Sequence, residues 1–228
     1  MTRLLLARHG ETAWNAERLI QGQSDDPLSE RGREQSRRLA QRLANEPIQA
    51  IYTSDLARSA ETAHIVAEGL AFSMAQSQSA SSANPRAVPV YTLPSLREMD
   101  FGEWEGRTQA EVRRDYPELA ALRRSDPLSF TPPGGEPFSG FIQRVQSTLD
   151  AILRKHPQDT VLVVSHGGPL CIILYTLLET TPIYPWRFRL NNASLSIVEV
   201  LTPQDGLPRP RVRAVLTLLN DTCHWSRD

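Results

Sequence analysis

The chain has 228 residues, of which 40% are hydrophobic, and its formal net charge is −1. This length is enough to bury the core of an α/β domain, while the near-neutral charge argues against nucleic acid or an anionic membrane as a partner. The longest apolar run is too short to span a bilayer, and residues 1–7 lack the features of a signal peptide. We therefore expect a cytoplasmic protein. Cys171 and Cys223 lie far apart and predict neither a disulfide framework nor a zinc site.

The apolar pattern predicts helices alternating with strands. A first strand begins near Leu4 and ends at Arg8, His9 and Gly10, and its continuous apolar character is typical of a buried parallel sheet. In the first half of the chain we then expect a helix over 29–45, a strand over 48–53, a helix capped by Ser54 or Asp55, and a strand over 88–93. A short helix opened by Thr108 and helices over 117–125 and 141–155 follow. The last expected elements are a strand over 160–164, a helix over 170–178, and two closing strands over 194–201 and 211–218.

This alternation predicts an α/β fold of three layers, αβα, with a mostly parallel central sheet. The whole of 1–228 is expected to form one domain, in which 103–140 is an insertion that caps the carboxyl ends of the strands. Residues 71–87 are small and polar, so we expect them to form a mobile loop.

Several reactive side chains are expected at one edge of this sheet. His9 follows the first strand, His166 follows the strand over 160–164, and Glu98 comes after the strand over 88–93. Arg58 lies in the first turn of a helix, where the helix dipole disfavours a cation unless an anion is shared there. Together with Arg8, these residues suit a phosphate dianion, because arginine forks match its oxygens.

With a phosphate held there, one histidine can attack phosphorus through a neutral ring nitrogen and the other can stabilise the transferring group. Glu98 is the candidate acid for the leaving oxygen, with Asp100 and Glu103 as weaker stand-ins. No metal-ligand spacing appears, so no metal and no cofactor are expected. Taken singly, each of these features is more often an ordinary surface pair or a solvated charge. Only their combination indicates a catalytic site.

Four stretches, LLLARHGETAWN, SDLARSAETA, LREMDFGEWEG and VVSHGG, resemble the signature segments of the histidine phosphatase superfamily, which includes the cofactor-dependent phosphoglycerate mutases. The resemblance implies a phosphohistidine intermediate on His9 and proton donation by Glu98. It also implies a phosphate or substrate pocket, lined by Arg8, Asn15, Gln21, Gly22, Arg58, His166 and Gly167.

Departures from the mutase pattern favour the phosphatase branch. Phe101 stands where mutases usually have tyrosine, and Gln109 stands where they usually have lysine. The GGEPFSGFIQRV stretch is similar to phosphatases, although Pro137 replaces a serine, whereas the pair Arg123-Arg124 followed by two prolines is similar to mutases. The sequence therefore predicts a metal-independent phosphomonoesterase acting on a small phosphorylated metabolite. The alternatives are a phosphoglycerate mutase and a non-catalytic phospho-ligand-binding protein.

Overall fold

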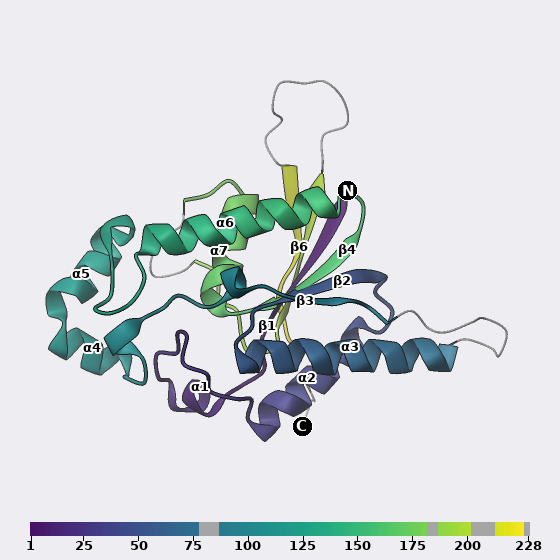
Figure 1. Ribbon diagram of the computed structural model, residues 1–228, viewed down its shortest axis with the longest axis horizontal. Coiled ribbons are helices and arrows are strands. Elements are labelled where there is room, and N and C mark those ends of the chain that lie inside the picture. The colour runs from purple at the N-terminus through teal and green to yellow at the C-terminus, as the bar shows by residue number, and fades with distance from the viewer. Residues whose placement is uncertain (78–86, 182–186, 202–212, 226–228) are drawn as a thin grey trace.

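The computed structural model describes residues 1–77, 87–181, 187–201 and 213–225, and within these ranges six strands form one sheet (Figure 1). The strands are β1 (Thr2–Arg8), β2 (Ile48–Thr53), β3 (Val90–Thr92), β4 (Thr160–Ser165), β5 (Leu195–Leu201) and β6 (Arg213–Asp221). They lie in the order β3-β2-β4-β1-β5-β6, in which only β5 runs against its neighbours. The predicted mostly parallel α/β sheet is confirmed.

Helices cover both faces of this sheet (Figure 1). They are α1 (Ala13–Glu17), α2 (Glu30–Leu43), α3 (Ala57–Ser77), α4 (Gln109–Asp115), α5 (Pro117–Ser125), α6 (Phe138–Lys155) and α7 (Gly167–Leu177), with single turns η1 (Pro94–Leu96), η2 (Gly102–Trp104) and η3 (Pro127–Ser129). α2 and α3 pack on one face, and α6 and α7 pack on the other.

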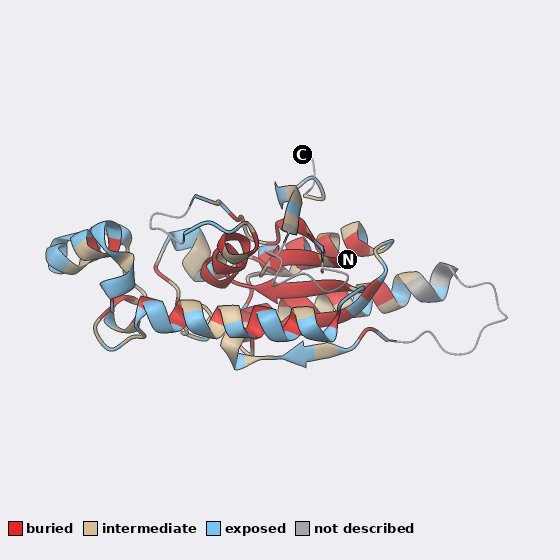
Figure 2. Ribbon diagram, turned by 90° about the horizontal axis from the view of Figure 1, so that it is seen from above, coloured by how far each residue is buried: buried red, intermediate tan, exposed pale blue. Residues whose placement is uncertain are grey.

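The side chains of β1 show why the sheet needs both layers. Leu4 and Leu6 belong to the core shared with α6 and α7, whereas Leu5 and Ala7 belong to the core shared with α2 and α3. All four are at most 2% exposed, and Figure 2 shows the central strands as a buried layer between the helices. Because successive side chains of a strand point to opposite faces, a continuous apolar run marks a strand covered on both sides.

Two predictions around α3 are wrong. The loop was expected over 71–87, but α3 continues through Ser77, so any loop begins later than predicted. Residues 78–86 lie outside the described residues. Alanine, glutamine and methionine, which are good helix formers, make up four of the seven residues of 71–77, so the helix continues through this stretch. Neither Ser54 nor Asp55 caps the helix: the Ala57 N–H donates to Asp25 Oδ1 at 2.7 Å, while Asp55 pairs with Arg97.

The segment 103–140 contains α4, α5 and η3, and it is tied to the loop that follows β1. Leu19 and Thr108 form an isolated β-bridge, and the Ile20 N–H donates to the Arg107 carbonyl at 2.8 Å. Its function as a cap stays a prediction, as does the single-domain assignment. The two closing strands expected over 194–201 and 211–218 are present as antiparallel β5 and β6, although residues 202–212 lie outside the described part.

α6 begins at Phe138, three residues before the expected start, because Phe138 is buried in the core beside Phe141. None of the helices in the described ranges combines the length and apolar character needed to cross a bilayer.

Candidate active site

The two predicted histidines meet at the carboxyl edge of the sheet. β1 and β4 are parallel neighbours in which Arg8 pairs with Ser165, so His9 and His166 follow at equivalent positions. The His9 N–H donates to the Ser165 carbonyl at 2.9 Å, and the ring centroids lie 5.0 Å apart. Both side chains are nearly fully buried. Two segments about 155 residues apart in the chain are therefore joined by the strand pairing itself.

His9 is held as a neutral ring with a free lone pair. Its Nδ1 lies 2.7 Å from the Gly10 carbonyl, which can only accept, so Nδ1 carries the proton and Nε2 keeps the lone pair. Burial lowers the pKa of His9 well below its ordinary value, and the charges of Arg58 and Arg8 lower it further. A neutral imidazole with this tautomer is the form that can attack phosphorus.

His166 directly precedes α7, and its ring is held by the residue that follows β2. Its Nε2 lies 2.7 Å from the Ser54 hydroxyl, while its Nδ1 is buried and has no hydrogen-bond partner among the described residues. Burial lowers the pKa of His166 well below its ordinary value, and the nearby Arg58 charge adds to this effect. The ring is therefore neutral until an anion arrives to offset the arginine charges.

Arg8 and Arg58 each use part of their guanidinium group to bind the protein backbone. Arg8 Nη1 donates to the Leu190 carbonyl at 2.8 Å, and the two Nη atoms of Arg58 donate to the Ser24 and Gly22 carbonyls at 2.7 and 2.6 Å. The Nε atoms of both arginines are buried without a partner among the described residues. Burial lowers the pKa of Arg58 to about 10, so it stays charged at neutral pH. Buried donors of this kind are normally satisfied, which indicates an anion-binding site.

Glu98 lies against the N-terminus of α7. Its two carboxylate oxygens accept the backbone N–H groups of Met99 and Gly168, each at 2.9 Å. Burial raises the pKa of Glu98, while these two amides and the charges of Arg8 and Arg58 partly oppose the rise. A carboxyl group whose pKa is raised beside a phosphate site has the property needed for a general acid.

Of the two glycines predicted to line the pocket, Gly22 lies where a side chain would not fit, and Gly167 lies at van der Waals distance from two other predicted site residues. The Gly22 carbonyl orients Arg58, and a Cβ on Gly22 would lie 2.6 Å from the Met99 carbonyl oxygen. A Cβ on Gly167 would lie 4.0 Å from Arg8 Nε and 3.9 Å from Glu98 Oε2. Gly167 therefore borders the same space as the catalytic candidates.

Asn15 and Gln21 belong to an amide network one step from His9. Asn15 Nδ2 donates to Gln21 Oε1 at 3.0 Å, and Asn15 Oδ1 accepts from Asn192 Nδ2 at 2.8 Å. Asn192 also contacts the His9 and Gly10 carbonyls, at 3.2 and 3.3 Å. All the predicted site residues thus gather around the ends of β1 and β4, and their binding roles stay predictions.

Glu105, which the sequence analysis did not single out, organises the loop that orients Arg58. Its carboxylate accepts the backbone N–H groups of Gln23 and Ser24, both at 2.8 Å, and that of Phe101 at 3.1 Å. The Ser24 carbonyl in turn receives Arg58 Nη1. A single carboxylate therefore connects the 103–140 segment to the phosphate pocket.

Arg144 on α6 holds the segment that carries Glu98. Its Nη1 donates to the Ser95 and Arg97 carbonyls at 2.9 and 2.8 Å, and its Nη2 donates to the Glu98 carbonyl at 2.9 Å. Glu136 pairs with the same guanidinium group. Arg144 is therefore a positioning residue for Glu98.

The sequence analysis also missed Ser54 and Asn192 as site residues. Ser54 was assigned to a helix cap, and Asn192 lies in a stretch with no helical or strand pattern. The one available signal was position: each lies next to a strand, Ser54 directly after β2 and Asn192 shortly before β5.

The described residues offer no trio of metal-ligating side chains around His9 and His166. Two imidazoles, two arginines and a carboxyl group beside a helix N-terminus instead define a site for phosphoryl chemistry.

Comparison with known proteins agrees with this geometry. Residues 4–207 match the model of the histidine phosphatase superfamily (branch 1). Phosphoserine phosphatase 1 of Hydrogenobacter thermophilus is 32% identical over 98% of this chain and 94% of its own length. A probable phosphoglycerate mutase GpmB of Yersinia enterocolitica is 35% identical over 87% of this chain and 85% of its own length. The structure of Bacillus stearothermophilus YhfR superposes with a TM-score of 0.79 at 34% identity, covering 98% of this chain and 99% of that one.

The chain belongs to branch 1 of the histidine phosphatase superfamily. The relatives include phosphatases and probable mutases, so the class is a phosphatase or mutase of the histidine type.

Proposed function

We propose that this protein is a metal-independent phosphomonoesterase that acts on a small phosphorylated metabolite through a phosphohistidine on His9. The observation that carries the proposal is a set of buried polar atoms around His9 that have no hydrogen-bond partner within the described part of the chain: Arg8 Nε, Arg58 Nε and His166 Nδ1. Leaving such atoms unpaired is costly, and phosphate oxygens would satisfy them.

The proposed reaction starts from a neutral His9 and a protonated Glu98. His9 Nε2 attacks phosphorus in line, the bond to the ester oxygen breaks, and Glu98 gives its proton to that oxygen, so that an alcohol leaves. The resulting Glu98 carboxylate then takes a proton from water as the water oxygen attacks phosphohistidine. Orthophosphate leaves, and both residues return to their starting forms. Arg8, Arg58 and His166 neutralise the charge of the transferring group throughout.

Phosphatase is favoured over mutase by Phe101 and Gln109, which replace residues that mutases use to hold their substrate. A phosphoserine phosphatase as a relative over nearly the whole chain supports a small phosphorylated substrate. The GpmB relative supports the second candidate, a mutase that would return the phosphoryl group to substrate. We also propose a cytoplasmic location, which cell fractionation would test.

The central experiment measures orthophosphate release from p-nitrophenyl phosphate in EDTA. We expect turnover by the wild type and its loss in His9→Ala, with an acid-labile, base-stable phosphoryl group trapped on the wild type alone. His64→Ala is the matched control, because His64 is an exposed histidine on α3.

Two other results would replace the proposal. Interconversion of 3- and 2-phosphoglycerate that depends on 2,3-bisphosphoglycerate, at a rate exceeding hydrolysis, would identify a mutase. If the protein binds phosphate but releases no orthophosphate from any of a broad set of phosphorylated metabolites, it is a non-catalytic phospho-ligand-binding protein.

A further inference from the structure

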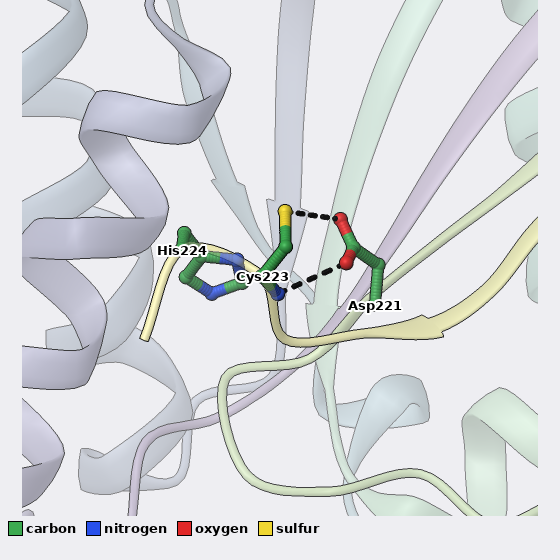
Figure 3. Close-up of side chains that lie close together, drawn as sticks. All are labelled: Asp221, Cys223 and His224. Carbon is green, nitrogen blue, oxygen red and sulfur yellow. Dashed lines mark hydrogen bonds between the residues drawn. The ribbon is translucent and has the colours of Figure 1, made fainter. Parts of the chain in front are cut away.

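Three potential metal ligands gather where β6 ends, outside the pocket of His9. Asp221 is the last residue of β6, and Cys223 and His224 follow in the next turn (Figure 3). One ligand atom from each of these three side chains lies within 4.8 Å of the other two. Counting cysteines in the sequence did not reveal this group, because it needs only one thiol.

His224 already has the tautomer that a metal ion requires. Its Nε2 lies 2.9 Å from the Ala193 carbonyl, which can only accept, so Nε2 carries the proton and Nδ1 keeps the lone pair. That Nδ1 atom is buried and has no hydrogen-bond partner among the described residues. Metal-bound histidines usually donate their other ring nitrogen to a carboxylate or a backbone carbonyl in this way.

The other two ligands are already oriented by each other. The Cys223 N–H donates to Asp221 Oδ1 at 3.0 Å, and the Cys223 thiol lies 3.2 Å from Asp221 Oδ2 (Figure 3). A metal ion that displaced the thiol proton to solvent would meet a thiolate, a carboxylate and a neutral imidazole, with a summed charge of about −2. Arg42 opposes this charge, because its Nε lies 3.7 Å from Asp221 Oδ2.

We propose that Asp221, Cys223 and His224 form a binding site for a divalent transition-metal ion of the zinc class. Thiolate and imidazole ligands select zinc-like ions over Mg²⁺ and Ca²⁺, which prefer oxygen ligands. Ligand atoms around a tetrahedral zinc ion lie about 3.5 Å apart, so atoms that already lie within 4.8 Å of one another need only small side-chain movements, and water fills the fourth position. Cys223 is exposed, which leaves the ion a path from solvent.

The bound ion would fasten the C-terminal turn to the strand end beside it. His224 contacts Ala193, whose own N–H donates to the Arg8 and His9 carbonyls, each at 3.0 Å. The site thus stabilises the edge of the sheet behind the catalytic pocket without providing a ligand to the phosphate. It does not depend on the proposed hydrolysis.

The test uses the untagged full chain and Co²⁺ as a spectroscopic probe. We expect one equivalent of Co²⁺ to give a thiolate-to-cobalt band in the near ultraviolet, and Zn²⁺ to displace it. The band is expected to disappear in Cys223→Ser and to persist in Cys171→Ala, because Cys171 is buried. Zn²⁺ affinity should fall by at least about tenfold in His224→Gln and stay unchanged in His64→Gln.

A band that is absent from the wild type, or that persists in Cys223→Ser, would overturn the site. So would equal zinc affinities of His224→Gln and His64→Gln. Circular dichroism shows whether each variant is folded. If a variant fails to fold, the Tm of the wild type decides: it should rise with Zn²⁺ concentration and not with Mg²⁺.

Discussion

Burial acts on His9 and Glu98 in opposite directions, and both shifts serve the proposed chemistry. Removal from water disfavours the charged form of either group, so it lowers the pKa of the His9 imidazole and raises that of the Glu98 carboxyl. A neutral nucleophile and a protonated acid can then coexist across a range of pH. Burial thus provides a nucleophile and an acid within one pocket.

Glu98→Gln should separate proton donation from phosphate binding. We expect kcat/KM for an alkyl phosphate, which reports the transfer of the phosphoryl group to His9, to fall by about 10²–10⁴-fold, since the alkoxide then leaves without a proton. The loss of kcat/KM with p-nitrophenyl phosphate should be much smaller, because nitrophenolate departs as an anion. Steady-state kinetics with both substrates checks this prediction, and the alkaline decline of the alkyl-phosphate rate should vanish in the variant. Glu103→Gln is the control, and an equal or larger loss there would transfer the acid role to Glu103.

Short single turns and loops, rather than helices, carry Glu98, and α6 holds them in place through Arg144. This residue donates to three backbone carbonyls in and after η1, those of Ser95, Arg97 and Glu98. The charge of Glu136 keeps the guanidinium group oriented. The position of the proposed acid therefore depends on a helix that contributes no atom to the reaction.

Arg144→Met should lower kcat for an alkyl phosphate and shift the alkaline limb of the pH profile, with little effect on KM. It should also lower the free energy of unfolding by about 1–3 kcal/mol, because three partly buried carbonyls lose their donor. Arg144→Lys should rescue the pH profile only in part, since an ammonium group cannot span the same acceptors. Arg154→Met, at an exposed site on α6, is the matched control. A stability loss with an unchanged kcat and pH profile would mean that Arg144 is purely structural.

The sequence predicts an element best where the residues of that element alone determine its structure. β1 and β4 are apolar runs that end in His9 and His166, so both the parallel sheet and the meeting of the two rings could be predicted. Contacts between distant loops could not be predicted. Asp25 caps α3 from another segment, and Glu105 looks like a solvated acid until its three amide donors are seen.

At the scale of the whole molecule, burying two uncharged imidazoles makes stability depend on pH. The pKa values of His9 and His166 are lowered on folding, so below the ordinary histidine value of about 6.5 the unfolded chain binds more protons than the folded one. The free energy of unfolding therefore falls as the pH drops below that value. Glu98 acts in the opposite sense, because its raised pKa favours folding as the pH decreases.

Comparing the wild type with His166→Gln isolates one of these histidines. The wild type should lose stability more steeply below about pH 6.5, by up to about 1.4 kcal/mol per pH unit, as expected for one extra proton taken up on unfolding. Urea denaturation at a series of pH values measures the difference in slope. His64→Gln should follow the wild type, and parallel curves for wild type and His166→Gln would contradict the neutral, buried state of His166.

The pairing of Arg8 with Ser165 across β1 and β4 has an evolutionary consequence. Neighbouring strands of any sheet lie about 4.8 Å apart, so main-chain spacing, rather than the packing of 103–140, determines how far apart the two rings begin. Insertions or deletions in the predicted cap that leave Glu105 in place would change what the site accepts while the spacing of the two histidines is kept. Proteins that descend from one ancestor can therefore differ in substrate while they keep the same catalytic step.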